Sequence, residues 1–245
     1  MTFKELKDRF FAASLEKCRI MLSEYSESNF FDKASELLDK EEQRLLDMCK
    51  YETFLQKSGI SLIAGTDEAG RGPLAGPIVA AAVILKNNDL LFGINDSKKL
   101  SAEKRDRLFD AILDNCIAAS IHTITNKQID EINIGKADRL ALKTSVEKLT
   151  VIPDHVLTDA FVIENLNINQ TPVTHGDALS VSIAAASIIA KVSRDRMMNE
   201  YDKIYPRYGF AKHKGYGTKE HIDAIKKYGI CPIHRKTFVK KYTDI

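Results

Sequence analysis

The chain has 245 residues, of which 44% are hydrophobic and 29% charged, with a net charge of +2, values typical of a globular protein with one sizeable core. No apolar run approaches the roughly 20 residues of a membrane span, and the N-terminus mixes charged and apolar side chains instead of forming a signal-peptide core. We therefore expect a cytoplasmic protein without membrane contact. Four widely spaced cysteines, none in a CxxC pair, predict neither a zinc site nor a disulfide framework.

Two amphipathic helices are predicted at the start of the chain. Apolar side chains recur at helical spacing over residues 3–25 and again over about 32–56, and Ser58-Gly59 supplies a stop. We interpret residues 1–58 as a helical hairpin added before a main domain of residues 59–245. Its expected role is packing or substrate grip, because nothing in it has a catalytic pattern.

From Ile60 onward the pattern changes to that of an α/β domain. It predicts strands at 60–66, 77–85, 117–124, 155–159 and 172–174, and helices at about 101–115, 126–133, 136–149, 179–205 and 219–228. The longest of these helices has a small apolar face rich in alanine, which would let it lie close to a sheet. A basic tail follows the last helix.

Charge is distributed unevenly along the chain. Residues 60–185 carry 12 Lys and Arg against 16 Asp and Glu, whereas residues 186–245 carry 14 against 6. An acidic middle beside a basic end suits a nucleic-acid enzyme, in which one part grips phosphates and another holds metal. A basic terminus is also common in other globular proteins, so charge alone leaves both interpretations open.

Four carboxylates follow or lie beside short apolar runs: Asp67, Glu68, Asp159 and Asp177. Strand ends and the loops beyond them can converge on one crevice of an α/β sheet, where ligands bind. Converging acids without basic partners would raise one another's pKa, and divalent cations would relieve that repulsion. All-oxygen ligation suits Mg²⁺ or Mn²⁺, and two such ions about 3.5–4 Å apart form a clamp that cleaves phosphodiesters. These four acids are therefore both the candidate metal ligands and the candidate catalytic residues.

The first acidic pair precedes a glycine-rich loop, Gly70-Arg71-Gly72-Pro73. Adjacent residues on a regular strand point to opposite faces. We therefore expect the first strand to bend or end at Asp67 and Glu68, so that both side chains reach the site.

Each acid also has a purely structural interpretation. Asp67-Glu68 alone is typical of an ordinary acidic turn. Asp159 could begin a turn, and Asp177 could be the N-cap of the helix that follows. Asp195, which is flanked by arginines inside a helix, is better explained by a structural ion pair than by catalysis. The six histidines form no HExxH pattern and no obvious cluster.

An ordered series of motifs extends over about residues 60–238. It consists of Gly65-Thr-Asp-Glu-Ala-Gly-Arg-Gly-Pro-Leu-Ala-Gly-Pro77, Asn95-Asp-Ser-Lys-Lys-Leu100, Leu157-Thr-Asp159, Gly176-Asp177, Ile183-Ala-Ala-Ala-Ser-Ile-Ile-Ala-Lys-Val-Ser-Arg-Asp195 and Tyr208-Gly-Phe-Ala-Lys-His-Lys-Gly-Tyr-Gly-Thr218. In this order the motifs resemble those of the ribonuclease HII family, the type 2 ribonucleases H. Residues 1–58 lie outside the resemblance.

The resemblance implies a ribonuclease H-like fold, in which helices flank a mixed sheet. It implies an endoribonuclease that cleaves the RNA strand of RNA–DNA hybrids with two Mn²⁺ or Mg²⁺ ions. It further implies incision 5′ of single ribonucleotides embedded in duplex DNA, leaving 5′-phosphate and 3′-hydroxyl ends. The family's metal-binding acids fall on the four positions already singled out: Asp67, Glu68, Asp159 and Asp177.

The resemblance also implies residues that contact the substrate. The family's Gly-Arg-Gly element falls on Gly70, Arg71 and Gly72, where backbone groups approach the ribose 2′-OH closely. The tyrosine that stacks at the RNA-to-DNA junction falls on Tyr216. The positions that match phosphate contacts are Ser97, Lys98, Ser187 and Lys191.

The chain departs from the family pattern beside two of the acids. Members usually have Asp-Gly at the third acid and Lys-Gly-Asp at the fourth, where this chain has Asp159-Ala160 and His175-Gly176-Asp177. Both departures keep the carboxylates but change the local turn and one nearby charge. The related type 3 enzymes have a lysine in place of the Gly-Arg-Gly arginine and a glutamate as the fourth acid, so Arg71 and Asp177 favour type 2.

Two other functions remain open at this point. A DNA nuclease or integrase-like enzyme on the same sheet would cut all-DNA duplexes, whereas the type 2 interpretation needs a 2′-OH. A non-catalytic nucleic-acid binder would show no dependence on Mg²⁺ or Mn²⁺. We expect a monomer, and the sequence does not decide whether a replication clamp is a partner.

Overall fold

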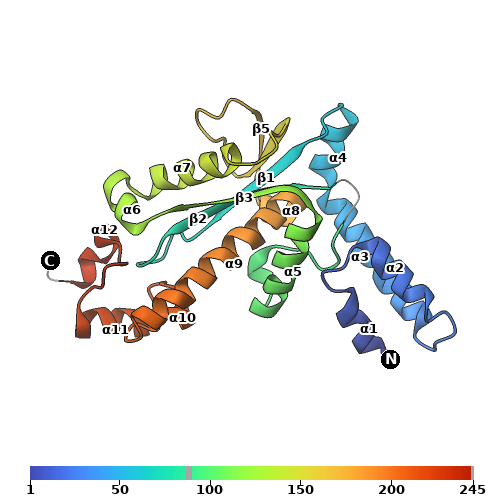
Figure 1. Cartoon of the computed structure of the whole chain (residues 1–245), viewed down its shortest axis with the longest axis horizontal. Helices are drawn as coiled ribbons and strands as arrows, with labels where there is room; N and C mark the ends of the chain where they lie inside the picture. The colour runs from blue at the N-terminus through green and yellow to red at the C-terminus, as the bar shows by residue number, and fades with distance from the viewer. Residues whose placement is uncertain (87–89, 244–245) are drawn as a thin grey trace.

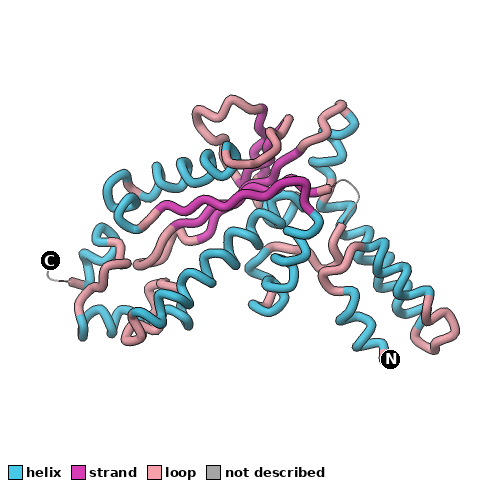
Figure 2. The backbone as a smooth tube through the Cα atoms, viewed as in Figure 1, coloured by secondary structure: helices cyan, strands magenta, loops and turns pink. Residues whose placement is uncertain are grey.

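One mixed sheet runs through the centre of the computed structural model, which describes residues 1–86 and 90–243 (Figures 1 and 2). The spatial order of its strands is β3-β2-β1-β4-β5. β1 pairs antiparallel with β2, and β2 with β3, whereas the β1–β4 and β4–β5 pairs are parallel. The strands are β1 (Ile63–Ala69), β2 (Ile78–Leu85), β3 (Cys116–Ile124), β4 (His155–Asp159) and β5 (Asn169–Val173). The predicted α/β class with a mixed sheet is confirmed.

Helices cover both faces of this sheet (Figure 1). α9 (Val181–Ile204) and α5 (Ala102–Asn115) share an apolar core with β2 on one face, and α7 (Ile134–Glu147) packs on the other. At Gly65 an added Cβ would lie 2.1 Å from the carbonyl carbon of Ser182, so α9 is in direct backbone contact with β1. The prediction that a small-residue face lets this helix approach the sheet is confirmed.

The first strand does not end at the acidic pair. β1 continues to Ala69, and both acids are paired with β2, Asp67 opposite Ala81 and Glu68 opposite Ala80. Of the two expected alternatives at this pair, a bend or an end of the strand, the end is wrong. Because strand pairing with β2 persists, the alternation of side chains across the sheet is kept through the pair.

The N-terminal segment contains more helices than the sequence predicts. The predicted helix 3–25 is divided into α1 (Phe3–Phe10) and α2 (Leu15–Ser23), and the predicted helix 32–56 into α3 (Phe31–Met48) and α4 (Lys50–Lys57). The first break occurs because Ala12, with φ of 66°, donates its N–H to the carbonyl of Phe92 at 2.9 Å. A tertiary backbone contact therefore replaces the helical hydrogen bonds that periodicity predicts.

The helix α4 reaches the main sheet through a buried carboxylate. Glu52 accepts hydrogen bonds from the Ser180 hydroxyl at 2.6 Å and from the Ser182 N–H at 3.0 Å. These are groups at the N-terminus of α9, where backbone N–H groups lack helical partners. The N-terminal helices are thus tied to the helix that covers the sheet.

The remaining elements complete the fold, and three short helices among them, α8, α10 and α12, are not predicted. They are α6 (Asn126–Ile132), α8 (Gly176–Leu179), α10 (Phe210–His213), α11 (Lys219–Tyr228), α12 (Lys236–Val239) and the 3₁₀ segments Ser97–Lys99 and Lys240–Tyr242. All four cysteines are free. Among the residues described, no helix is long and apolar enough to cross a membrane.

The C-terminal helices enclose a histidine cluster that the sequence analysis missed. His213 and His221 stack with ring centroids 4.5 Å apart, and His221 Nε2 lies 3.1 Å from His234 Nε2. The expectation that the histidines form no cluster is therefore wrong. Residues up to 21 positions apart meet here because α10, α11 and the segment before α12 pack on one another, which no local spacing reveals.

Candidate active site

The four predicted acids lie where two parallel strands and a short helix meet. Asp67 and Glu68 are on β1, Asp159 is the last residue of its parallel neighbour β4, and Asp177 is in α8. Thr66 pairs with Thr158 in the parallel register, so the first and third acids occupy adjacent positions. The N–H of Gly176 donates to Asp159 Oδ1 at 2.7 Å, which ties the start of α8 to the end of β4.

Burial and mutual repulsion raise the pKa values of the two strand carboxyls. Burial is the main cause of the rise of the pKa of Asp67 to about 7, and the charges of Asp159 and Asp177 add to it. The Ser187 hydroxyl lies against Asp67 and opposes this rise. The pKa of Glu68 is raised well above its ordinary value by burial and then by the charge of Asp67. The site therefore holds more negative charge than its protein surroundings neutralise.

Glu68 has neighbours on the opposite side of the sheet, including an acid that the sequence analysis missed. Asp138 on α7 is 2% exposed, and its Oδ2 lies 3.1 Å from Arg71 Nε. Glu68 Oε1 lies 3.7 Å from Arg71 Nη1, so the two acids share one arginine. The only sequence signal for Asp138 is its position among the apolar residues of the helix face that includes Ala137 and Ala141.

The predicted phosphate-contact residues divide into two groups. Lys98 Nζ lies 2.9 Å from Asp177 Oδ2 and Ser187 lies against Asp67, so these two residues border the acids directly, whereas Ser97 reaches them through Ser187, whose Oγ lies 2.9 Å from Ser97 Oγ. Lys191 instead pairs with Asp195, with Nζ 2.7 Å from Oδ1. The prediction of a structural ion pair for Asp195 is thereby confirmed, although its partners are Lys191 and, at 3.8 Å, Arg105 instead of the flanking arginines.

The Gly-Arg-Gly loop and the predicted junction tyrosine are neighbours. Gly72 and Tyr216 are both exposed, and an added Cβ at Gly72 would lie 3.8 Å from the Tyr216 ring. The Leu74 N–H donates to the Gly215 carbonyl at 2.8 Å, which joins the two loops through the backbone. Residues about 140 positions apart therefore form one surface beside the acids.

The departures from the family pattern fall on strained backbone. Ala160 has φ of 65° and His175 has φ of 59°, both in the left-handed region that favours glycine. His175 precedes α8 without a side-chain cap bond, and Ser180 caps α9. Asp177 lies inside α8, so the alternative in which it is a helix N-cap is wrong. The altered residues keep the turns and leave both carboxylates beside Asp67.

The donor set fits hard divalent cations. Among the residues described, no group of three or more His, Cys, Asp or Glu side chains lies close enough together to hold a metal ion as the side chains stand. The acids nevertheless present only carboxylate oxygens, the charges of Asp159 and Asp177 add to the rise of the pKa of Asp67, and Asp177 already pairs with the Lys98 ammonium. Mg²⁺ or Mn²⁺ would supply the missing positive charge with the ligand type that these ions prefer.

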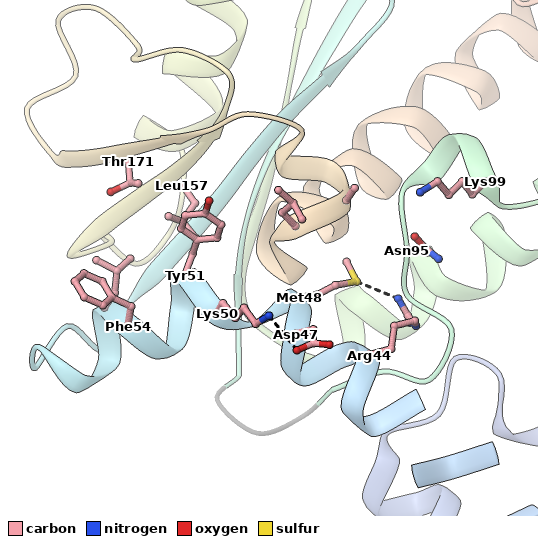
Figure 3. A pocket seen from close by; sticks show the side chains of 13 residues that line it. Arg44, Asp47, Met48, Lys50, Tyr51, Phe54, Asn95, Lys99, Leu157 and Thr171 are labelled. Atoms are coloured by element: carbon pink, nitrogen blue, oxygen red, sulfur yellow. Dashed lines mark hydrogen bonds and ion pairs between the residues drawn. The ribbon is translucent and has the colours of Figure 1, made fainter. Parts of the chain in front are cut away.

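A cleft of about 790 Å³ lies beside α8 (Figure 3). Figure 3 shows Tyr51 and Phe54 of α4 on one wall and Lys99 with Asn95 on another. Ala178 and Leu179, which follow Asp177, also line it. None of the four acids lines this cleft.

Comparisons with known sequences identify relatives over most of the chain. The family model described as ribonuclease HII matches residues 64–241. A ribonuclease HII from Acetivibrio thermocellus is 55% identical over 212 residues, which are 86% of this chain and 83% of that protein. One from Ruminiclostridium cellulolyticum is 45% identical over 254 residues, which are 100% of this chain and 99% of the relative. The second match includes residues 1–58, which the motif series leaves outside the resemblance.

A solved structure shows the same fold. The chain resembles the ribonuclease HII in the structure of the PCNA:RNase HII complex from Archaeoglobus fulgidus, with a TM-score of 0.64 and 25% identity. The likeness covers 73% of this chain and 94% of that one. The ribonuclease H-like arrangement of sheet and helices is therefore confirmed.

Proposed function

Because the chain belongs to the ribonuclease HII family, whose members are metal-dependent endoribonucleases acting on RNA–DNA hybrids, we propose that it also incises duplex DNA 5′ of a single embedded ribonucleotide. The products would be a 5′-phosphate and a 3′-hydroxyl. The observation that carries this proposal is the cluster of Asp67, Asp159 and Asp177, close in sequence to the Gly-Arg-Gly loop, which lies against the exposed Tyr216.

The four acids are proposed to act as ligands of two Mn²⁺ or Mg²⁺ ions. Such ions, when bound, lower the pKa of the attacking water and stabilise the leaving oxygen. The protein supplies the oxygens of Asp67 and Asp159 on neighbouring strands, with Glu68 and Asp177 on either side. Lys98 holds Asp177 at 2.9 Å in the free protein and would move toward substrate phosphate when a cation takes its place.

Substrate recognition is proposed for the loops that border the acids. Gly70, Arg71 and Gly72 present backbone to the ribose, and the exposed ring of Tyr216 stacks at the junction that follows it. Two sets of side chains would contact the phosphates: Ser97, Lys98 and Ser187 near the acids, and Lys191 beside Asp195.

Substitution of single acids tests the site. Asp67→Asn and Asp159→Asn should each abolish cleavage, because a neutral amide cannot replace a carboxylate ligand of Mg²⁺ or Mn²⁺. The substrate is duplex DNA with one ribonucleotide, incubated with and without Mn²⁺, and the cut is mapped to the nucleotide. Circular dichroism would check that each variant remains folded. Wild-type rates in either variant would refute the assignment, and cutting of an all-DNA duplex would indicate a DNA nuclease instead.

A second substitution tests the junction residue. Tyr216→Ala should reduce incision at a single ribonucleotide by about tenfold, since a stacked base on an aromatic ring contributes on the order of 1–3 kcal/mol. Cleavage within a long RNA tract should change less, because no junction is required there. An unchanged ratio between the two substrates would remove the proposed role.

The wider setting of the enzyme is part of the same proposal. The chain would act as a cytoplasmic monomer, with residues 1–58 as an extension of a catalytic domain of residues 59–245. The PCNA complex of the Archaeoglobus relative supports a replication clamp as a partner. Sedimentation of the purified chain, alone and with a clamp, tests both the monomer and the contact.

A further inference from the structure

Two arginines are buried beneath the Gly-Arg-Gly loop. Arg194 on α9 is 1% exposed and Arg235, just before α12, is 0% exposed. Across residues 1–86 and 90–243, neither forms an ion pair with a carboxylate within 4.0 Å. A buried guanidinium without a counter-ion is costly unless its N–H groups are all hydrogen-bonded. Burial, and then the charge of Arg194, lower the pKa of Arg235 to about 9, which leaves it charged at neutral pH.

Backbone carbonyls take the place of the missing counter-ion. Arg235 donates to the carbonyls of Gly70 at 2.5 Å, Arg71 at 2.9 Å and Gly76 at 3.0 Å. Arg194 donates to Pro77 at 2.9 Å, Ala75 at 3.2 Å and Lys214 at 2.9 Å. Five carbonyls of one eight-residue loop, residues 70–77, thus point inward at two cations.

The inward carbonyls determine where the adjacent N–H groups point. No cis peptide bond occurs among the residues described, and in a trans peptide the N–H of the next residue points opposite to the carbonyl. With the Gly70 and Arg71 carbonyls on Arg235, the N–H groups of Arg71 and Gly72 point away from it, toward solvent. In the described part of the chain, neither N–H has a protein acceptor. Two successive free N–H groups therefore face the surface.

That surface is the one beside Tyr216. Arg194 also lies under the tyrosine ring, with its guanidinium carbon 5.9 Å from the ring centroid. Gly70 has φ of 103°, and an added Cβ would lie 2.2 Å from Arg194 Nε, so the loop closes directly on the guanidinium. One buried pair thus supports both the glycine loop and the aromatic ring.

Resting on the proposed function, we propose that Arg194 and Arg235 are positioning residues for ribose recognition: by holding the loop carbonyls inward they present the Arg71 and Gly72 N–H groups to the ribonucleotide beside Tyr216. A hydroxyl has lone pairs that accept from these N–H groups, and a deoxyribose has none at that position. The role depends on the planar fork of arginine. A lysine ammonium keeps the charge but cannot reach three separated carbonyls in one plane.

Conservative substitution separates this role from simple stability. In Arg235→Lys and Arg194→Lys, kcat/KM for a duplex with one ribonucleotide should fall on the order of 100-fold, the effect of a misplaced positioning group. Affinity for the matching all-DNA duplex should stay within about threefold, since phosphate contacts do not depend on the loop. Arg107→Lys is the control, because Arg107 also donates to carbonyls, of Asp8 at 2.6 Å and Phe11 at 3.0 Å, far from the loop in sequence and outside the site. All variants are assayed at least 15 °C below their own Tm.

Hydrogen–deuterium exchange of the wild-type chain gives a test that needs no variant. Without divalent metal, the amides of Arg71 and Gly72 should exchange fast in the free protein and slow at least tenfold with the ribonucleotide duplex, but not with the all-DNA duplex. Equal protection by both duplexes, or Lys variants that behave like Arg107→Lys, would overturn the inference. If the wild type itself fails to incise at the ribonucleotide, the proposed function fails, which is a separate result.

Discussion

Asp138→Asn isolates the cost of a buried charge beside the candidate site. Asp138 is 2% exposed, one of its oxygens lies 3.1 Å from Arg71 Nε, and the other has no hydrogen-bond partner. Burial raises the pKa of Asp138 from 3.8 to about 6, although Arg71 opposes the rise. Asparagine has nearly the same shape, so the substitution removes the charge with little change in packing.

The size of the effect follows from that pKa. A rise from 3.8 to about 6 makes ionisation of Asp138 about 3 kcal/mol less favourable in the folded chain than in the unfolded one. A carboxyl whose pKa is raised by folding favours the folded chain while it is protonated. This contribution is complete below the unfolded pKa of 3.8 and is lost as the pH rises through about 6. Between pH 4 and 7 the wild type should therefore lose about 2 kcal/mol of unfolding free energy relative to Asp138→Asn.

Urea unfolding of both proteins at a series of pH values between 4 and 7 measures this difference directly. Asp106→Asn is the control, because Asp106 forms an exposed ion pair with Arg196 at 2.9 Å and should change stability by less than about 1 kcal/mol at any pH. A difference between wild type and Asp138→Asn that does not change with pH would refute the reasoning. Cleavage should fall several-fold in Asp138→Asn, since Arg71 loses its charged anchor.

Two further predictions concern stability. Ala160→Gly should raise the unfolding free energy by about 1 kcal/mol and Tm by about 2–4 °C, because Ala160 has φ of 65°, which glycine adopts without strain. A lower Tm would contradict this. Ala178→Gly in α8 is the control, which should destabilise the protein. Burial lowers the pKa values of His221 and His234 to about 4. As the pH falls, the unfolded chain therefore binds these protons before the folded chain does. Below about pH 6.5 the free energy of unfolding should fall, by on the order of 3 kcal/mol for each histidine once the pH has reached about 4. His234→Gln should show a shallower loss in urea titrations between pH 7.5 and 5, and an equal slope would exclude the cluster as the cause.

The placement of the candidate acids on and beside the strands could be predicted largely from the sequence. Asp67, Glu68 and Asp159 follow apolar runs that are strands in the structure, and strand ends in an α/β sheet are where ligands bind. β4 spans residues 155–159 and α11 spans 219–228, as predicted. These features depend on periodicity and on motifs of a few residues, which the folded chain does not alter.

Contacts between distant segments were decided only by the tertiary structure. Asp138 forms an ion pair with Arg71, and Arg235 donates hydrogen bonds to carbonyls more than 150 positions earlier in the chain. Neither contact has a local signal, because a buried charge becomes favourable only when packing brings its partners within hydrogen-bond distance. The acids could thus be predicted from the sequence alone. The residues that orient the Gly-Arg-Gly loop, which are Asp138, Arg194 and Arg235, contact it only after α7, α9 and the C-terminal segment have packed around it.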